Sequence, residues 1–273
     1  QNNNLPIFVV SLPGESVRKD LIRQQLDGYP GHWEFFDAVV PGTTLDVGWD
    51  SDLDPKRSIP ILGRSMTRGE FGCSYSHLKL MQRVLCDGHQ AAIILEDDAI
   101  LSGDLSLVSD LALKIIAFDV LLLGYSKVSA ATLWLRHLSE PMHSMATIFG
   151  RKLGFAYRER RSGTVGYLVT ASGAKKLLEI QQDVVTVADD WPLFKAKGLK
   201  IAHVFPTVVL EDIYSTSSSI ADERKKLEGD WKRKFELLRS LARVLRGAIW
   251  SLRLATNSAK LSKQYLIVQN KNS

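Results

Sequence analysis

The stretch AAIILEDDAIL, residues 91–101, ends an apolar run in three consecutive carboxylates, Glu96, Asp97 and Asp98. Neighbouring carboxylates repel one another, and a buried carboxylate is costly unless it is paired or bound to a metal ion. Glu96 and Asp98 are two residues apart, and two carboxylates with that spacing at a strand end can hold Mg²⁺ or Mn²⁺ together with a diphosphate. The ion would stabilise charge on a departing nucleoside diphosphate. The triplet alone leaves a solvated turn as the alternative.

A second acidic pair, Asp189 and Asp190, precedes Trp191 and Pro192. Transfer of a sugar with inversion needs a carboxylate that takes the proton from the acceptor hydroxyl as this hydroxyl attacks the anomeric carbon. Either aspartate has the chemistry of such a base, and the face of Trp191 is suited to stacking on a sugar ring. An Asp just before a first helical turn that contains Pro is also a common N-cap. Both roles are compatible, because one Asp can cap the helix while the other faces the site.

The histidines and cysteines give weaker indications. His77 lies in a segment with helical periodicity, where a lone histidine more often makes structural hydrogen bonds than binds a metal. His203, in the last predicted strand, is a weaker candidate ligand still. Cys73 and Cys86 are 13 residues apart with no paired Cys/His set nearby, which argues against a zinc site. Their place in or beside a predicted helix also favours small buried side chains over a disulfide.

The elements that must position these groups follow from hydrophobic periodicity. Residues 6–12 form a β-branched apolar run typical of a buried parallel strand, residues 15–28 have helical spacing, and residues 33–40 indicate a second strand. A strand, a helix and a strand in succession predict an α/β fold. Residues 41–66, rich in Gly, Pro, Asp and Ser, are expected to form a long binding loop or lid.

The acidic triplet is positioned by the next helix and strand. Thr67 and Glu70 form a capping-box signature and Gly88 is a stop signal, so a helix is predicted over 67–88. Residues 91–101 then form a strand that carries the triplet toward its C-terminal end, where ligands bind in open α/β sheets. Further elements are predicted at 105–116 (helix), 118–124 (strand), 164–182 (strand, turn and helix) and 200–209 (strand), while 125–160 has no interpretable pattern.

The totals describe a globular chain of 273 residues, 45% hydrophobic and 24% charged. No run of ~18 apolar residues predicts a membrane-spanning helix, and the N-terminal stretch lacks the basic region of a signal peptide. An intracellular protein is therefore expected. The charge is uneven, because residues 221–273 carry 13 Lys/Arg against 5 Asp/Glu, whereas the rest of the chain carries 22 against 25.

This asymmetry divides the chain into a domain at 1–220 and a basic tail at 221–273. In residues 231–254, apolar and aromatic side chains recur every three or four positions with Lys and Arg between them. The pattern is typical of an amphipathic helix on an anionic membrane surface, where each basic residue contributes on the order of 1 kcal/mol. A terminal helix packed on the core is the alternative. Nucleic acid is not expected, because no recognised nucleic-acid motif appears.

Five stretches together resemble glycosyltransferase family 25, the bacterial lipooligosaccharide galactosyltransferases and their relatives. In chain order, and over roughly residues 5–220, they are PIFVVSLPGESVRKD, MTRGEFGCSYSHLKLM, AAIILEDDAIL, GTVGYLVTASGAKKLL and VFPTVVLEDIYSTSSSI. The resemblance implies a GT-A-like (Rossmann-like) nucleotide-sugar-binding fold with a mostly parallel central sheet. It also implies a divalent metal (Mn²⁺ or Mg²⁺), a UDP-sugar donor that is most often UDP-galactose, and transfer with inversion.

The resemblance also implies roles for individual residues. Glu96 and Asp98 match the metal-binding acidic motif, and Asp189 and Asp190 fall where the family has an acidic site, without showing which of them is the base. Contacts to the nucleotide sugar are expected from Ser11, Leu12, Arg18, Glu70, Ser76, His77 and Asp97.

The expected function is a metal-dependent, inverting transfer of a hexose to a lipooligosaccharide core sugar, at the cytoplasmic face of the bacterial inner membrane. Two alternatives stay open. A nucleotidyltransferase would also use an acidic metal site at a strand end, but SLPGESVRK is poor in the glycines that such enzymes usually carry after the first strand. The other is a non-catalytic, membrane-bound scaffold with a degenerate transferase fold, against which the intact acidic residues argue.

Overall fold

The computed structural model describes residues 5–42, 55–126, 142–182, 184–212, 245 and 247–249. The helices are α1 (Ser16–Leu26), the 3₁₀ helix η1 (Pro55–Ser58), α2 (Ile59–Leu62), α3 (Arg68–Cys86), α4 (Leu105–Ile115), α6 (Ala171–Ile180) and α7 (Trp191–Ala196). The strands are β1 (Ile7–Ser11), β2 (Trp33–Asp37), β3 (Ala91–Glu96), β4 (Ala99–Leu101), β5 (Val120–Leu122), β6 (Gly124–Tyr125), β7 (Met142–Ile148), β8 (Arg151–Ala156), β9 (Gly166–Thr170), β10 (Ile201–Phe205) and β11 (Val209–Glu211). Among these residues, no helix combines the length and the apolar character needed to cross a bilayer.

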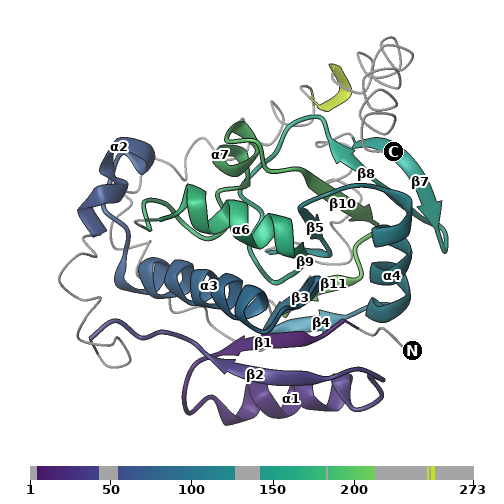
Figure 1. Cartoon of the computed structure of the whole chain (residues 1–273), viewed down its shortest axis with the longest axis horizontal. Coiled ribbons are helices and arrows are strands. Elements are labelled where there is room, and N and C mark those ends of the chain that lie inside the picture. The colour runs from purple at the N-terminus through teal and green to yellow at the C-terminus, as the bar shows by residue number, and fades with distance from the viewer. Residues whose placement is uncertain are drawn as a thin grey trace.

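One large mixed sheet has the strand order β2-β1-β3-β9-β5-β10-β8-β7, and β4-β11-β6 form a small second sheet (Figure 1). Strand β1 is parallel to β2 and β3, and β5 is parallel to β10. Strand β9 is antiparallel to both β3 and β5, and β8 is antiparallel to both β10 and β7. The predicted α/β fold is confirmed. The prediction of a mostly parallel sheet is wrong, because antiparallel pairings outnumber parallel ones in it.

Strand β9 shows the physical reason for that error. Its residues 166–169 are all buried. A strand that is apolar on both faces has the same hydrophobic pattern in either direction. It runs between β3 and β5, with Gly166 opposite Leu95 near the end of β3. The residues that precede β9 therefore lie at the end of β3 that carries the acidic triplet.

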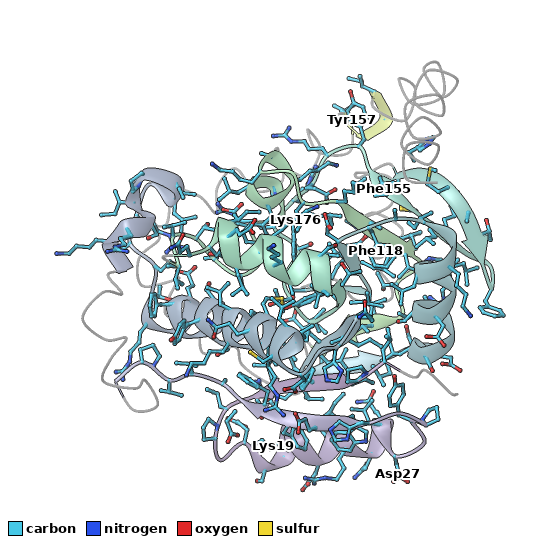
Figure 2. The ribbon with its side chains drawn as sticks, in the orientation of Figure 1. Lys19, Asp27, Phe118, Phe155, Tyr157 and Lys176 are labelled. Atoms are coloured by element: carbon cyan, nitrogen blue, oxygen red, sulfur yellow. The ribbon has the colours of Figure 1, made fainter. Side chains whose placement is uncertain are left out.

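The central strands face two separate cores. Ile7 and Val9 of β1 pack with side chains of α1 and α4, whereas Phe8 and Val10 pack with side chains of α3, α6 and α7. Figure 2 shows the side chains that fill the space between the sheet and these helices. Full burial of an Ile or Phe side chain contributes about 1.5–3 kcal/mol, so the two cores hold the strand ends of the site in place.

Most predicted elements are confirmed with shifted ends. The helix predicted at 67–88 is α3, and Thr67 and Glu70 make both hydrogen bonds of its capping box. The strand predicted at 91–101 is divided into β3 and β4, which flank Asp97 and Asp98. The uninterpreted region contains the antiparallel pair β7 and β8.

Two predictions lie partly outside the described residues. Residues 43–54 of the predicted loop are among the undescribed ones, while 55–62 are helical (η1 and α2) rather than loop. Of the predicted tail, only 245 and 247–249 are described, all of them helical. The division of the chain at residue 220 and the amphipathic tail helix therefore stay predictions.

Candidate functional site

The carboxyl ends of β1 and β3 lie side by side, with Val10 paired with Glu96. Together with residues after β2 and one face of α3, they border a cleft of about 420 Å³. This is the edge of the sheet at which α/β folds bind ligands. The cleft is lined by eight of the residues selected from the sequence, which are Ser11, Leu12, Arg18, Ser76, His77, Glu96, Asp97 and Asp98. Their roles in binding stay predictions.

Asp97 is held by two side chains from the first strand and helix. The Ser11 hydroxyl donates to Asp97 Oδ2 over 2.7 Å, and Arg18 Nη1 donates to Asp97 Oδ1 over 3.2 Å. Because Asp97 is buried, the guanidinium compensates a charge that would otherwise be costly there. Asp97 therefore orients Arg18 at the edge of the cleft.

Asp98 is the carboxylate of the triplet best suited to a cation. Its Oδ1 is buried and has no hydrogen-bond partner among the described residues. Burial and the negative charge of three neighbours raise the pKa of Asp98 to about 8; the neighbours are Glu96, Glu211 and Asp97. A divalent cation would compensate the charge that burial penalises. The residues present therefore fit the predicted Mg²⁺ or Mn²⁺.

The pKa of Glu96 is lowered, whereas that of Asp98 is raised. Burial by itself would raise its pKa, but His77, Thr164 and Arg18 together lower it below the usual value. The Thr164 hydroxyl donates to Glu96 Oε1, and His77 Nε2 lies 3.8 Å from the same oxygen. The two predicted metal ligands thus differ, because the neighbours of Glu96 favour its charged form, whereas burial and the neighbours of Asp98 disfavour its charged form.

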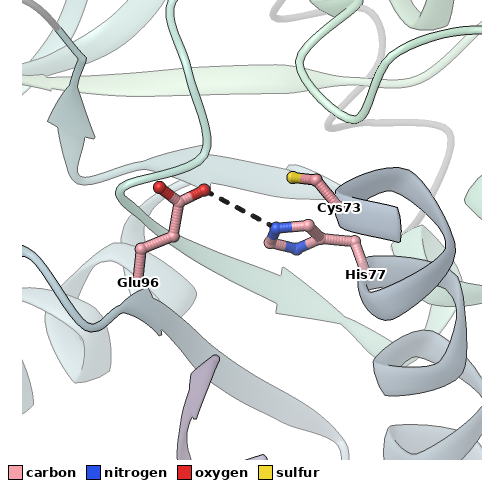
Figure 3. A group of neighbouring side chains, drawn as sticks. All are labelled: Cys73, His77 and Glu96. Atoms are coloured by element: carbon pink, nitrogen blue, oxygen red, sulfur yellow. Dashed lines mark ion pairs between the residues drawn. The ribbon is translucent and has the colours of Figure 1, made fainter. Parts of the chain in front are cut away.

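His77 connects α3 to the central sheet. Its Nδ1 shares a hydrogen bond of 2.7 Å with the Tyr167 hydroxyl, while its buried Nε2 has no hydrogen-bond partner among the described residues. Burial raises the pKa of Tyr167 well above its ordinary value, so this hydroxyl stays protonated. Figure 3 shows His77 and Cys73 extending from α3 on the side where Glu96 lies.

The wall that α3 contributes to the cleft depends on Gly72. A Cβ at this position would lie 2.5 Å from Val39 O and 2.9 Å from Pro41 Cδ, so only glycine permits the approach. One turn later, Ser76 Oγ accepts a hydrogen bond from Val39 N over 2.8 Å and donates to Gly72 O over 2.7 Å. The backbones of α3 and of the segment after β2 are therefore in close contact.

The structure shows a capping role for Glu70, and its predicted contact to the nucleotide sugar stays a prediction. Its carboxylate accepts hydrogen bonds from the backbone N of Thr67 over 2.9 Å and from two guanidinium nitrogens of Arg64 over 2.7 Å each. It is buried and is not among the described residues that line the cleft. The reason is the capping box, which turns the side chain at the third helical position back toward the N-cap.

The second acidic pair divides into two environments. Asp190 is buried and accepts hydrogen bonds from Thr186 Oγ1 over 2.6 Å and from Arg161 Nη2 over 2.8 Å. Asp189 Oδ2 accepts a hydrogen bond from the backbone N–H of Gly163 over 3.0 Å. Asp190 is thus committed to holding the structure, whereas Asp189 is attached to the segment that leads into β9.

The expectation that Trp191 stacks on a sugar ring is wrong. Its side chain is buried, with edge contacts to Tyr167 and Phe194 at ring-centroid distances of 5.7 Å each. Its indole N–H donates to Gly163 O over 3.1 Å. The first turn of α7 directs Trp191 into the core, because this large apolar surface gains more from burial than from exposure at a rim.

Gly163 and Thr164 connect the two acidic clusters, and neither was predicted from the sequence to belong to the site. Gly163 has a φ of 79° and binds Asp189, and the next residue donates to Glu96. The feature of the sequence that could have indicated them is a Gly-Thr pair shortly before a buried strand. Cys73 was also missed as a partner of His77, although a spacing of four residues puts both on one face of a helix.

His203 belongs to a separate buried network. Its Nδ1 bonds the Tyr125 hydroxyl over 2.9 Å and its Nε2 bonds Glu159 Oε2 over 2.8 Å. Lys195 Nζ donates to Glu159 Oε1 over 3.0 Å. Burial alone would raise the pKa of Glu159, but His203 and Lys195 lower it. His203 is therefore held by partners of its own and does not line the cleft.

The sequence of this chain is similar to those of known glycosyltransferases. The sequence model of a family described as glycosyltransferase family 25 (LPS biosynthesis protein) matches residues 4–191. A candidate glycosyltransferase of Haemophilus influenzae is 25% identical over 257 residues, which cover 86% of this chain and 81% of that protein.

Longer animal proteins match over part of their length. Procollagen galactosyltransferase 1-A of Xenopus laevis is 25% identical over 186 residues, which cover 64% of this chain and 28% of that protein. Inactive glycosyltransferase 25 family member 3 of Homo sapiens is 25% identical over 193 residues, covering 64% of this chain and 29% of that protein. The chain thus spans less than a third of the length of these two relatives.

Proposed function

We propose a donor, a reaction and an acceptor for this chain, which belongs to glycosyltransferase family 25. The reaction is an inverting, metal-dependent transfer of a hexose, with galactose from UDP-galactose as the expected donor, to a lipooligosaccharide core sugar. The family supports glycosyl transfer in general, and some relatives are named as inactive. The observation that carries the proposal is the cleft at the ends of β1 and β3, where the buried Asp98 Oδ1 has no hydrogen-bond partner in the described part of the chain and could bind a cation.

The donor end of the reaction is assigned to this cleft. Asp97, which accepts a hydrogen bond from Ser11, holds Arg18 at its edge, where a guanidinium would bind a diphosphate oxygen. Glu96 and Asp98 would hold the divalent ion, which when bound supplies Lewis-acid stabilisation of the leaving nucleoside diphosphate. The nucleoside is assigned to the part of the cleft bordered by Ser76 of α3 and by the segment after β2.

Asp189 is the proposed general base. Asp190 has hydrogen bonds from Thr186 and Arg161, which favour a structural role. Asp189 is not among the described residues that line the cleft, but it accepts a hydrogen bond from the backbone N–H of Gly163, and the next residue, Thr164, donates to Glu96 at the cleft. In the proposed step, Asp189 accepts the proton of the acceptor hydroxyl while the acceptor oxygen bonds to the anomeric carbon. The bond from that carbon to the diphosphate oxygen breaks, and the nucleoside diphosphate leaves.

The proposed acceptor is lipid-linked, which assigns the enzyme to the cytoplasmic face of the bacterial inner membrane. The basic and apolar pattern of 231–254 supports this assignment. Two described residues of the tail add to it, because Leu245 is 65% exposed and Ile249 is 53% exposed. An apolar side chain that is exposed in the folded chain is available to insert into a lipid surface.

The test is release of UDP from a panel of UDP-sugars, with lipooligosaccharide acceptor, in the presence and absence of Mn²⁺. Release that needs the acceptor and the metal, and that occurs with a single donor, would establish transfer and identify the sugar. The same reaction without acceptor is the control for hydrolysis. If UDP binds with Mn²⁺ in calorimetry but no donor turns over, the non-catalytic scaffold replaces the enzyme as the better account.

A further inference from the structure

Three side chains of different chemistry converge at the wall of the cleft. Cys73 and His77 lie one turn apart on α3, and Glu96 ends β3. The thiol sulfur, an imidazole nitrogen and a carboxylate oxygen all lie within 4.8 Å of one another, and His77 Nε2 is 3.8 Å from Glu96 Oε1 (Figure 3). All three residues line the cleft, although His77 Nε2 itself is buried.

The hydrogen bonding of His77 is an independent indication of a ligand. Its side chain is 8% exposed, and the nitrogen that faces the cluster, Nε2, has no hydrogen-bond partner among the described residues. The other ring nitrogen is held by the Tyr167 hydroxyl at 2.7 Å. A histidine that binds a metal has this arrangement, because an outer hydrogen bond at one nitrogen fixes the ring and directs the other nitrogen to the ion.

We propose that Cys73, His77 and Glu96 bind a thiophilic divalent cation, for which Zn²⁺ is the best fit. Zn²⁺ accepts sulfur, imidazole nitrogen and carboxylate oxygen together, whereas Mg²⁺ prefers oxygen ligands alone. Tetrahedral zinc puts ligand atoms roughly 3.3–3.8 Å apart. The present spacing therefore needs only a side-chain adjustment of roughly 1 Å. The fourth position would face the cleft and take water or a ligand oxygen.

This site has a consequence that rests on the proposed function. Glu96 belongs to both the zinc cluster and the proposed Mn²⁺ or Mg²⁺ pair with Asp98. Zinc bound at Cys73 and His77 would withdraw Glu96 from that pair and occupy the space of the diphosphate. Zn²⁺ would then inhibit transfer, and the two ions would compete for one carboxylate.

The experiment titrates the metal-free, full-length protein with Co²⁺ and with Zn²⁺, in a non-thiol reductant. Co²⁺ in a thiolate site gives an intense near-ultraviolet charge-transfer band, which reports directly on Cys73. The matched variants are Cys73→Ser and Cys86→Ser, since Cys86 is exposed at the end of the same helix. We expect one Zn²⁺ per chain, at least about tenfold weaker binding in Cys73→Ser, and wild-type binding in Cys86→Ser. Equal thermal unfolding temperatures would show that both variants fold.

Absence of the charge-transfer band at saturating Co²⁺, or equal Zn²⁺ affinity in wild type and Cys73→Ser, would overturn the proposal. The titration measures metal binding and does not depend on turnover of a UDP-sugar. If zinc binds as expected but no UDP-sugar is used, the proposed function fails and the zinc site stands. If transfer is observed but zinc does not bind at this site, the zinc proposal fails and the proposed function stands.

Discussion

The backbone N–H of Gly163 donates to Asp189 Oδ2 over 3.0 Å, and this contact ties the second acidic pair to the segment that also contacts the first. The residue after Gly163 holds Glu96 through its hydroxyl. A proposed base and a proposed metal ligand therefore share one short support, the segment that leads into β9. Displacing that segment would disturb both ends of the proposed reaction together.

Asp98→Asn tests the cation site. The amide keeps the shape but removes the charge that the metal needs, so we expect metal-dependent UDP release to fall at least about 100-fold. The metal-free variant should unfold at a temperature at least as high as that of the wild type, because repulsion from Glu96 and Glu211 is removed. Transfer at normal metal concentration in this variant would exclude the metal role of Asp98.

Asp189→Asn and Asp190→Asn separate the base from the structural aspartate. General-base catalysis contributes about 10²–10⁴-fold, so Asp189→Asn should lower kcat by that factor with little change in unfolding temperature. Asp190→Asn weakens the hydrogen bonds with Arg161 and Thr186 and should lower the unfolding temperature. The opposite pattern, with kcat sensitive only to Asp190, would reverse the assignment.

Gly72→Ala tests the wall of the cleft. The new methyl would approach Val39 O to 2.5 Å, so we expect a loss of about 1–3 kcal/mol in unfolding free energy and weaker binding of UDP. Gly28→Ala is the control, because a Cβ at Gly28 meets no atom within 4 Å. Urea unfolding and UDP calorimetry on both variants provide the comparison. Equal unfolding free energies and equal UDP affinities in the two variants would show that the wall is not tightly packed at Gly72.

Glu159→Gln tests the buried network that contains His203. Removing one partner from a buried ion pair costs about 3–5 kcal/mol, and Gln, which keeps some hydrogen bonding, should cost less. The folded pKa of Glu159 is lowered from 4.5. Its contribution is therefore present above the unfolded pKa and is lost as the pH falls through the folded pKa.

Urea unfolding at several pH values measures this effect. The difference between wild type and Glu159→Gln should be full near neutral pH and should shrink below about pH 4.5. Glu179→Gln, at an exposed position of α6, is the control and should have little effect. A difference that stays constant down to strongly acidic pH would mean that the charge of Glu159 does not stabilise the fold.

Leu245→Glu tests membrane binding in the full-length chain. Leu245 is 65% exposed and Val17 of α1 is 68% exposed, so Val17→Glu introduces the same charge at a matched exposure outside the tail. We expect Leu245→Glu to weaken binding to vesicles that contain anionic lipid about tenfold, and Val17→Glu to leave it unchanged. Co-sedimentation with these vesicles and with neutral ones measures the difference. Unchanged binding of Leu245→Glu would favour a tail that packs on protein.

Local patterns in the sequence determined the first strand, helix and strand, the capped helix α3 and the strand that ends in Glu96. Each of these depends on side chains within one or two turns of one another, so periodicity and capping signals are sufficient to predict it. The acidic triplet was found for the same reason, because three carboxylates after an apolar run conflict with burial unless a ligand is present.

The tertiary structure alone decided how the acidic residues divide their roles. Thr164 meets Glu96 across 68 residues and His77 meets Tyr167 across 90, and no local pattern records such contacts. The reversed direction of β9 produced them, since a strand buried on both faces gives no sign of its direction. Packing likewise turned Trp191 into the core, because apolar burial outweighed the exposed role that its sequence position had indicated.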